Sequence, residues 1–274
     1  MKKGISIVIL LLMSQLLIHC KSGLVTTSNK CYNAINSADA QNKAGDYTDA
    51  LSNFNEVIKQ CDAYDAKEKA YAGKATALNG LHQYQDALTA AGQGLKINKN
   101  SINNLFAKAN AEEGLGMHDA AVTDLNSITS LTSKNRNTAE RATIYAKLAE
   151  VNSRQRNYTE ALKNIQEAIT LDPGNLNFYE QKGDIHSAAG DFSEAMTDYD
   201  DAIAKGKDDA EAWKSKTVLQ VKILQKKYGT DNAGELARKM NSAEKKSLCE
   251  TISKGQTRGM KDMTIDLLQT SVCR

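Results

Sequence analysis

The sequence predicts an all-α protein built from repeated pairs of helices. The stretch from Asn157 to Pro173 places apolar and small side chains three, four and seven residues apart, which is the spacing of an amphipathic helix. The composition agrees, because 41% hydrophobic but only 5% aromatic residues favour helices packed through small side chains. Pro173 is the one proline of the chain and follows the stretch, where a helix must stop.

Weaker copies of this pattern recur along the chain, each with an aromatic residue or a histidine three positions before an alanine. The alanines are separated by 37, 34, 40 and 34 residues and are Ala50, Ala87, Ala121, Ala161 and Ala195. A period near 34 residues built from two helices resembles the tetratricopeptide repeat. The resemblance covers residues 31–226 and implies about five repeats and a capping helix, stacked as antiparallel helix pairs in a right-handed solenoid.

The first helix pair is expected to open near Cys31, and Gly45 is expected to end its first helix. In the second pair, Gly92 and Gly94 could be mistaken for part of a phosphate loop. No strand precedes them and no Gly-Lys-Ser/Thr follows, so close helix packing is the preferred interpretation.

Residues 135–141 add about six residues to the period between the third and fourth pairs. A longer loop or an extra helical turn begun at Thr138 would account for them.

The array is expected to end with a capping helix over residues 210–226, in which Trp213 takes the aromatic position and lysines keep the other face in water. Residues 227–274 lose the repeat and are predicted to be a helical extension that folds back on the end of the array. Within this extension Asn241 with Glu244 marks a helix start, and Leu248 with Ile252 gives an apolar stripe.

Residues 1–20 have the pattern of an export signal: Lys2 and Lys3 precede an apolar run that is too short for a confident membrane span. The run ends Leu17-Ile18-His19-Cys20, which resembles a bacterial lipoprotein box, with His19 where a small residue is expected. The resemblance implies that Cys20 is lipidated, that residues 21–30 form a tether, and that the protein is an outer-membrane lipoprotein facing the periplasm or the surface. Ordinary secretion with cleavage near Ser22, or a retained membrane anchor, stays open.

The chain has five cysteines, so assigning Cys20 to lipid leaves an even number. Cys31 and Cys61 stand at the two ends of the first helix pair that lie side by side, which predicts a disulfide between them. Cys249 and Cys273 remain as the second pair. No Cys-x-x-Cys motif or Cys/His cluster is present, so no metal site is expected.

Charge and motif content argue against nucleic acid and catalysis. The formal net charge is +2 and falls to zero, with 33 basic and 33 acidic residues, when Lys2 and Lys3 are removed with the leader. The four histidines fall in the leader, a turn, an aromatic position and a helix, with no nucleophile arranged beside them. Asp198, Asp200 and Asp201 lack the pattern of a calcium loop and are interpreted as a solvated face. We therefore expect no enzyme activity, no cofactor and no nucleic-acid partner.

The resemblance also implies an inner groove, lined mainly by the first helix of each repeat, that holds an extended peptide or a partner helix. The residues carried over to that groove are Tyr32, Asp39, Asn42, Lys69, Thr76, Asn103, Phe106, Asn110, Glu113, Lys147, Glu150, Arg154, Glu180 and Asp184. Asn103, Phe106 and Asn110 share one helical face and form the candidate hot spot, although a merely solvated surface stays open as an alternative. Some members of the family grip a carboxyl terminus, but Ile35 and Asp39 stand at the matching positions here.

These observations predict a non-enzymatic protein- or peptide-binding scaffold, exported to a bacterial envelope and anchored by lipid. Two alternatives stay open. One is a small-molecule or glycan-processing function that involves residues 228–274. The other is an assembly factor, similar to a pilotin.

Overall fold

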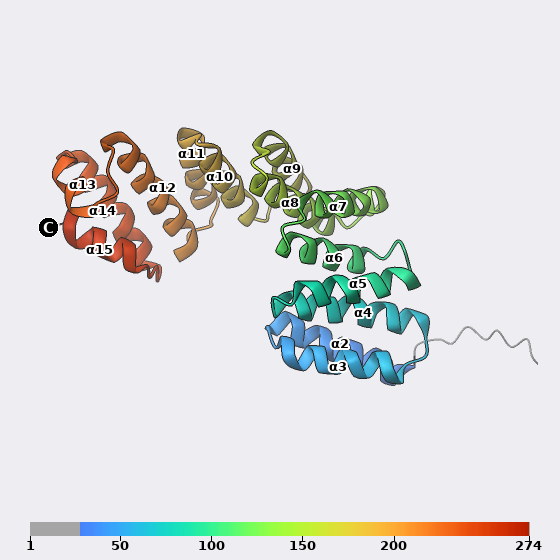
Figure 1. Cartoon of the computed structure of the whole chain (residues 1–274). Helices are drawn as coiled ribbons and strands as arrows, with labels where there is room; N and C mark the ends of the chain where they lie inside the picture. The colour runs from blue at the N-terminus through green and yellow to red at the C-terminus, as the bar shows by residue number, and fades with distance from the viewer. Residues whose placement is uncertain (1–27, 274) are drawn as a thin grey trace, which may run out of the picture. The chain divides into compact units, whose positions relative to one another are not determined.

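The computed structural model describes residues 28–273, and across this range the regular secondary structure is helical, with no strand (Figure 1). The predicted all-α class built from helix pairs is therefore confirmed. The leader and Cys20 lie outside the described residues. The chain divides into two compact units, Met1–Ala107 and Lys108–Arg274, and each is treated separately below. No helix in residues 28–273 combines the length and apolar character needed to cross a membrane.

The first unit consists of two helix pairs and the beginning of a third. Its helices are α2 (Asn29–Ala44), α3 (Tyr47–Gln60), α4 (Tyr64–Gly80), α5 (Tyr84–Ile97) and the first part of α6 (Ile102–Gly114). From α2 to α5 each helix packs on the next in the chain, and α2 also packs on α4. The first helices of neighbouring pairs therefore touch one another directly, as in a stacked repeat.

Local signals set the ends of α2. Ser28 caps its start by accepting a hydrogen bond from the Cys31 backbone N–H at 3.3 Å, so the helix begins inside the segment expected to be a tether. Gly45 ends it in the left-handed region with φ 86°, a conformation that glycine adopts without a steric penalty. The predicted stop at Gly45 is confirmed.

Glycines let the helices of the first unit approach closely. A Cβ atom on Gly73 would lie 2.1 Å from the ring of Phe54, which is fully buried, and one on Gly94 would lie 2.1 Å from the Asn104 side chain. Neither neighbour could accept a methyl group without moving. The close-packing interpretation of Gly94 is confirmed, whereas nothing lies within 4 Å of a Cβ on Gly92.

A disulfide joins the ends of the first helix pair, as the sequence predicts. Cys31 in α2 is bonded to Cys61 just after α3, with Cα atoms 6.1 Å apart and a sequence separation of 30. Cys61 is buried in the same core as Ile35 and Phe54. The bond therefore fixes the open end of the hairpin to its hydrophobic core.

The second unit continues from the last part of α6 to the end of the chain. Its helices are α7 (His118–Thr132), α8 (Thr138–Arg154), α9 (Tyr158–Leu171), α10 (Asn177–Ala189), α11 (Phe192–Ala204), α12 (Ala210–Tyr228), α13 (Ala233–Lys239), α14 (Ser242–Thr257) and α15 (Met263–Val272). Here α8 packs on α10 and α10 on α12, so first helices again form a layer. The extra residues before α8 make a loop and a helix start, where Asn137 caps the Glu140 N–H at 3.2 Å.

The C-terminal helices pack on α12, where the sequence predicts an extension that folds back on the array. Both α13 and α14 contact α12, and Leu224 of α12 shares a buried core with Leu236, Leu248 and Ile252. The lysines near the end of α12, Lys222, Lys226 and Lys227, are exposed as expected. Asn241 and Glu244 form the predicted capping box at the start of α14. A second disulfide, Cys249–Cys273, ties α14 to the end of α15.

Candidate protein-binding surface

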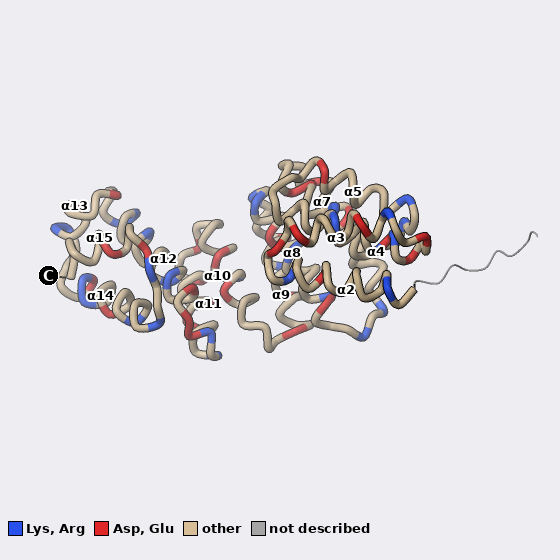
Figure 2. The backbone as a smooth tube through the Cα atoms, turned by 90° about the horizontal axis from the view of Figure 1, so that it is seen from below, with Lys and Arg blue, Asp and Glu red and all other residues tan. Residues whose placement is uncertain are grey.

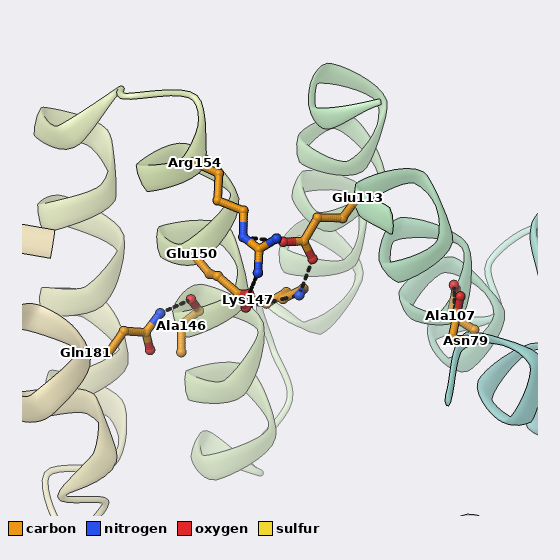
Figure 3. Close-up of polar contacts among 8 residues, drawn as sticks. All are labelled: Asn79, Ala107, Glu113, Ala146, Lys147, Glu150, Arg154 and Gln181. Atoms are coloured by element: carbon orange, nitrogen blue, oxygen red, sulfur yellow. Dashed lines mark hydrogen bonds and ion pairs between the residues drawn. The ribbon is translucent and has the colours of Figure 1, made fainter. Parts of the chain in front are cut away.

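In the first unit, asparagine side chains hold neighbouring first helices together. Asn42 and Asn79 each stand eight residues before the repeat alanine, Ala50 or Ala87. The Asn42 amide donates to the Gly73 carbonyl at 2.9 Å, and the Asn79 amide donates to the Ala107 carbonyl at 2.8 Å. The same repeat position therefore makes the same neutral contact twice, the second of which is drawn in Figure 3.

The third copy of this position is Glu113, and it makes an ionic contact in the second unit. Its carboxylate forms ion pairs with Lys147 Nζ and, at 3.0 Å, with Arg154 Nε (Figure 3). Glu150 closes the network, 3.0 Å from Lys147 Nζ and 2.8 Å from Arg154 Nη2. Two carboxylates and two cations thus form one network of ion pairs on the layer of first helices, with the Glu113 side chain only 6% exposed.

A further contact joins α10 to α8. The Gln181 amide donates to the Ala146 carbonyl at 2.8 Å, across the same layer of first helices (Figure 3).

Asp198 corrects the interpretation of the acidic run on α11 as a solvated face. It is 7% exposed, and its carboxylate lies 2.9 Å from Lys182 Nζ and 2.5 Å from His186 Nδ1. Asp200 and Asp201 are exposed as expected. A buried carboxylate needs partners. Here both partners lie on α10, 12 and 16 residues before Asp198, whereas helical spacing considers only residues three or four positions apart.

The predicted binding residues of the first unit keep their polar groups available. Lys69, Thr76 and Asn103 are exposed, and Phe106 is half-buried. No ion pair or hydrogen bond joins the Lys69 or Asn103 side chain to another described residue, and Thr76 only bonds back to the Ala72 carbonyl of its own helix at 3.1 Å.

Two neighbouring groups add charge and apolar area to the face of the first unit. Partial burial raises the pKa of the Asp39 carboxyl, against the opposing effect of Lys43 and Lys69. The Tyr32 side chain is 53% exposed. The surface thus offers aromatic contacts, a cation and an amide on consecutive first helices.

The predicted binding residues of the second unit are mostly occupied. Lys147, Glu150 and Arg154 belong to the ion network described above. Glu180 is buried and accepts from the Ser215 hydroxyl at 3.0 Å. Asn110 is half-buried and makes no hydrogen bond to another described residue.

The sequence analysis placed Glu113 on the inner face but did not predict its ion pairs with Lys147 and Arg154. The signal was available, because Glu113 takes the repeat position of Asn42 and Asn79 while Lys147 takes that of Gly73 and Ala107. Charge matching across two repeats would have found the pair. No group of three or more metal-ligating side chains is gathered anywhere in residues 28–273.

Comparison with known proteins agrees with this geometry. Residues 101–226 match the tetratricopeptide repeat-like domain family, whereas no curated protein matches the chain. A tetratricopeptide repeat protein from Parabacteroides merdae is 14% identical, covers 90% of this chain and 100% of its own length, and has a TM-score of 0.56. A thermophilic repeat protein from Thermus thermophilus is 15% identical, with 69% and 98% covered and a TM-score of 0.57.

MamA from Desulfovibrio magneticus is similar at 17% identity, with 66% of this chain and 98% of that chain covered and a TM-score of 0.53. At these identities the likeness concerns the fold. The chain therefore has the fold of tetratricopeptide repeat proteins, and its residues 101–226 match the tetratricopeptide repeat-like domain family.

Proposed function

We propose that this protein is a non-enzymatic scaffold that binds an extended peptide or a partner helix on the exposed face of α2, α4 and the start of α6. One observation carries the proposal: the Lys69 and Asn103 side chains are exposed and form no hydrogen bond or ion pair with another described residue, and Phe106, on the same helix as Asn103, is only half-buried. Amide and ammonium groups can hydrogen-bond a peptide backbone, and an aromatic side chain supplies apolar contact area.

The leader supports the further proposal that the scaffold is exported to a bacterial envelope and anchored through lipid on Cys20. Both disulfides of the structure are consistent with an oxidising compartment. Mass spectrometry of the N-terminal peptide from membranes of cells expressing the full chain tests this. Recovery of Cys20 with attached acyl chains, and release of a Cys20→Ser variant into the soluble fraction, would support the anchor. An unprocessed leader or an unmodified Cys20 would contradict it.

Site-specific photo-crosslinking tests the binding surface. A photoreactive amino acid placed at Thr76 or Asn103 is expected to crosslink to the same discrete partner band, and Phe106→Ala in the same chain is expected to reduce that band severalfold. The matched control places the photoreactive group at Thr89, which is exposed on the second helix of the second pair. Equal crosslinking from Thr89, or no effect of Phe106→Ala, would refute the location.

A further inference from the structure

A hollow of about 310 Å³ opens between α10, α11 and α12 in the second unit, apart from the surface proposed above. Ala188, Val218 and Leu219 give it an apolar lining, and Val218 is 36% exposed. Its volume is at the small end of the range for ligand sites, which suits a single side chain better than a whole small molecule.

The charged groups around the hollow leave a surplus of negative charge. Lys214 is tied to Asp262 at 3.6 Å, and outside the lining Glu180 is tied to Lys207 at 3.4 Å. Asp184, Glu211 and Lys222 form no ion pair with another described residue, which leaves two carboxylates against one ammonium group. The surplus therefore lies on the wall formed by α10 and α12.

Two titratable groups at the hollow, Asp184 and Tyr199, have raised pKa values, mainly because they are buried. The Tyr199 hydroxyl donates to Asp184 Oδ1 at 2.6 Å, so that Asp184 Oδ2 keeps its hydrogen-bonding capacity. Burial raises the pKa of Asp184; the Tyr199 hydrogen bond and Lys222 oppose this shift, while Glu180 and Glu211 add to it. Burial and the Asp184, Glu180 and Asp198 carboxylates likewise raise the pKa of Tyr199.

We propose that this hollow binds a basic side chain, an arginine or a lysine, of a peptide ligand. The methylene stem would lie on Ala188, Val218 and Leu219, as long basic side chains do on apolar surfaces. The charged head would take Asp184 Oδ2 and the Glu211 carboxylate, which offer acceptors without a resident partner. The site rests on the proposed peptide-binding function but uses none of the residues tested for it by crosslinking, so either result can fail without the other.

The test is an NMR titration of the isotope-labelled soluble chain with three capped tripeptides, acetyl-Ala-X-Ala-amide, where X is arginine, citrulline or glutamate. Citrulline has the shape of arginine without its charge. The arginine peptide is expected to shift the backbone amides of Ala188, Ser215, Val218 and Leu219, with at least about threefold weaker binding of citrulline and no shifts with glutamate. Equal binding of arginine and citrulline, shifts centred elsewhere, or no shifts with arginine would overturn the proposal.

Variants sharpen the same titration. Asp184→Asn keeps an acceptor for Tyr199 and Glu211→Gln keeps the side-chain size, and each is expected to weaken arginine binding about threefold to tenfold. Asp201→Asn is the matched control, since it removes one exposed carboxylate of α11 that does not line the hollow. Binding should also weaken as pH falls through the raised pKa of Asp184, and this dependence should be smaller in Asp184→Asn, which keeps only the Glu211 carboxylate. Loss of binding in Asp201→Asn equal to that in Asp184→Asn would contradict the site.

Discussion

The two units join neighbouring first helices through the same repeat position but with different chemistry. In the first unit Asn42 and Asn79 donate neutral hydrogen bonds to backbone carbonyls. In the second unit Glu113 makes ion pairs with Lys147 and Arg154. The comparison teaches that an amide at this position uses only backbone carbonyls of the next first helix, whereas a carboxylate there engages the charged side chains of that helix.

The pairing of charged side chains also differs between the two units. Acidic and basic residues are interspersed along the helices of both units (Figure 2). In the second unit many of them are paired, such as Lys182 with Asp198 between α10 and α11, and Arg258 with Asp208 between the end of α14 and the loop before α12. We therefore expect the stability of the second unit to depend on salt and pH, and that of the first to depend more on its disulfide.

The largest expected effect concerns the Cys31–Cys61 bond. Replacing both cysteines with alanine should lower the free energy of unfolding of the first unit by about 3 to 4 kcal/mol, because a 30-residue loop is no longer closed in the unfolded chain. The chain has one tryptophan, Trp213, in the second unit, so its fluorescence reports that unit while far-UV circular dichroism reports both. The dichroism transition should shift and the fluorescence transition should stay.

The control for that experiment is the double alanine variant of Cys249 and Cys273, which should move the Trp213 transition instead. If the two probes shift together in both variants, the units unfold as one and the proposed difference between them fails.

Glu113→Ala should lower the stability of the second unit by about 2 kcal/mol, since it leaves Lys147 and Arg154 with only Glu150 as a carboxylate partner. Urea unfolding followed by Trp213 fluorescence measures it. The effect should shrink in high salt, because part of the lost energy is Coulombic. A loss that is unchanged by salt would mean that Glu113 acts by packing alone.

Helix periodicity predicted most of the helices of the fold. It did not predict which polar side chains pair between helices. The repeat alanines located the second helix of each pair, and Gly45 and Asn241 marked ends that the structure confirms. The partners of Asp198 could not be predicted from periodicity, because they come from a different helix and depend on how far one helix is rotated against another. The partner of Glu113 required charges to be matched across two repeats, which periodicity alone does not do.

The candidate site divides along the same line. Repeat alignment placed Lys69, Thr76, Asn103 and Phe106 on first helices, where the structure leaves them exposed or half-buried. It placed Lys147, Glu150 and Arg154 equally well, but it could not tell that these three would form ion pairs. Whether a side chain is free to bind a ligand depends on whether it forms an ion pair within the protein. That cannot be read from its position in the repeat alone.

Asn79→Ala should cost about 1 kcal/mol in the first unit, the usual net value of one neutral hydrogen bond, with little dependence on salt. Circular dichroism unfolding of the whole chain measures it, with Trp213 fluorescence as the internal control. A second variant replaces the ionic contact between Glu113 and Lys147 with a neutral one of the Asn79–Ala107 type. Glu113→Asn with Lys147→Ala should recover part of the stability lost in Glu113→Ala and remove the salt dependence of that loss. No recovery would show that the position requires more than an amide.

The smallest effect is expected at the C-terminal helices, where Glu244 accepts from Lys227 at 2.6 Å and from the Tyr228 hydroxyl at 2.7 Å. These hydrogen bonds, with that of the Asn241 N–H, lower the pKa of Glu244 to about 2. A carboxylate with a lowered pKa stabilises the folded state above its ordinary pKa, and the contribution is lost as pH falls from about 4.5 towards about 2. Protease sensitivity of α14 should therefore rise slightly over this range.

Glu244→Gln is the matched variant for that titration. It should start with the weaker protection of α14 and show a smaller additional loss on acidification, because the group that titrates is gone. The Asn79–Ala107 junction of the first unit contains no ionisable group, so amide exchange measured at Ala107 and its neighbours should change less with acid than exchange in α14. Equal acid sensitivity of amide exchange at Ala107 and in α14 would mean that ionic and neutral contacts do not distinguish the two units. The unpaired polar side chains of the first unit would then need another explanation.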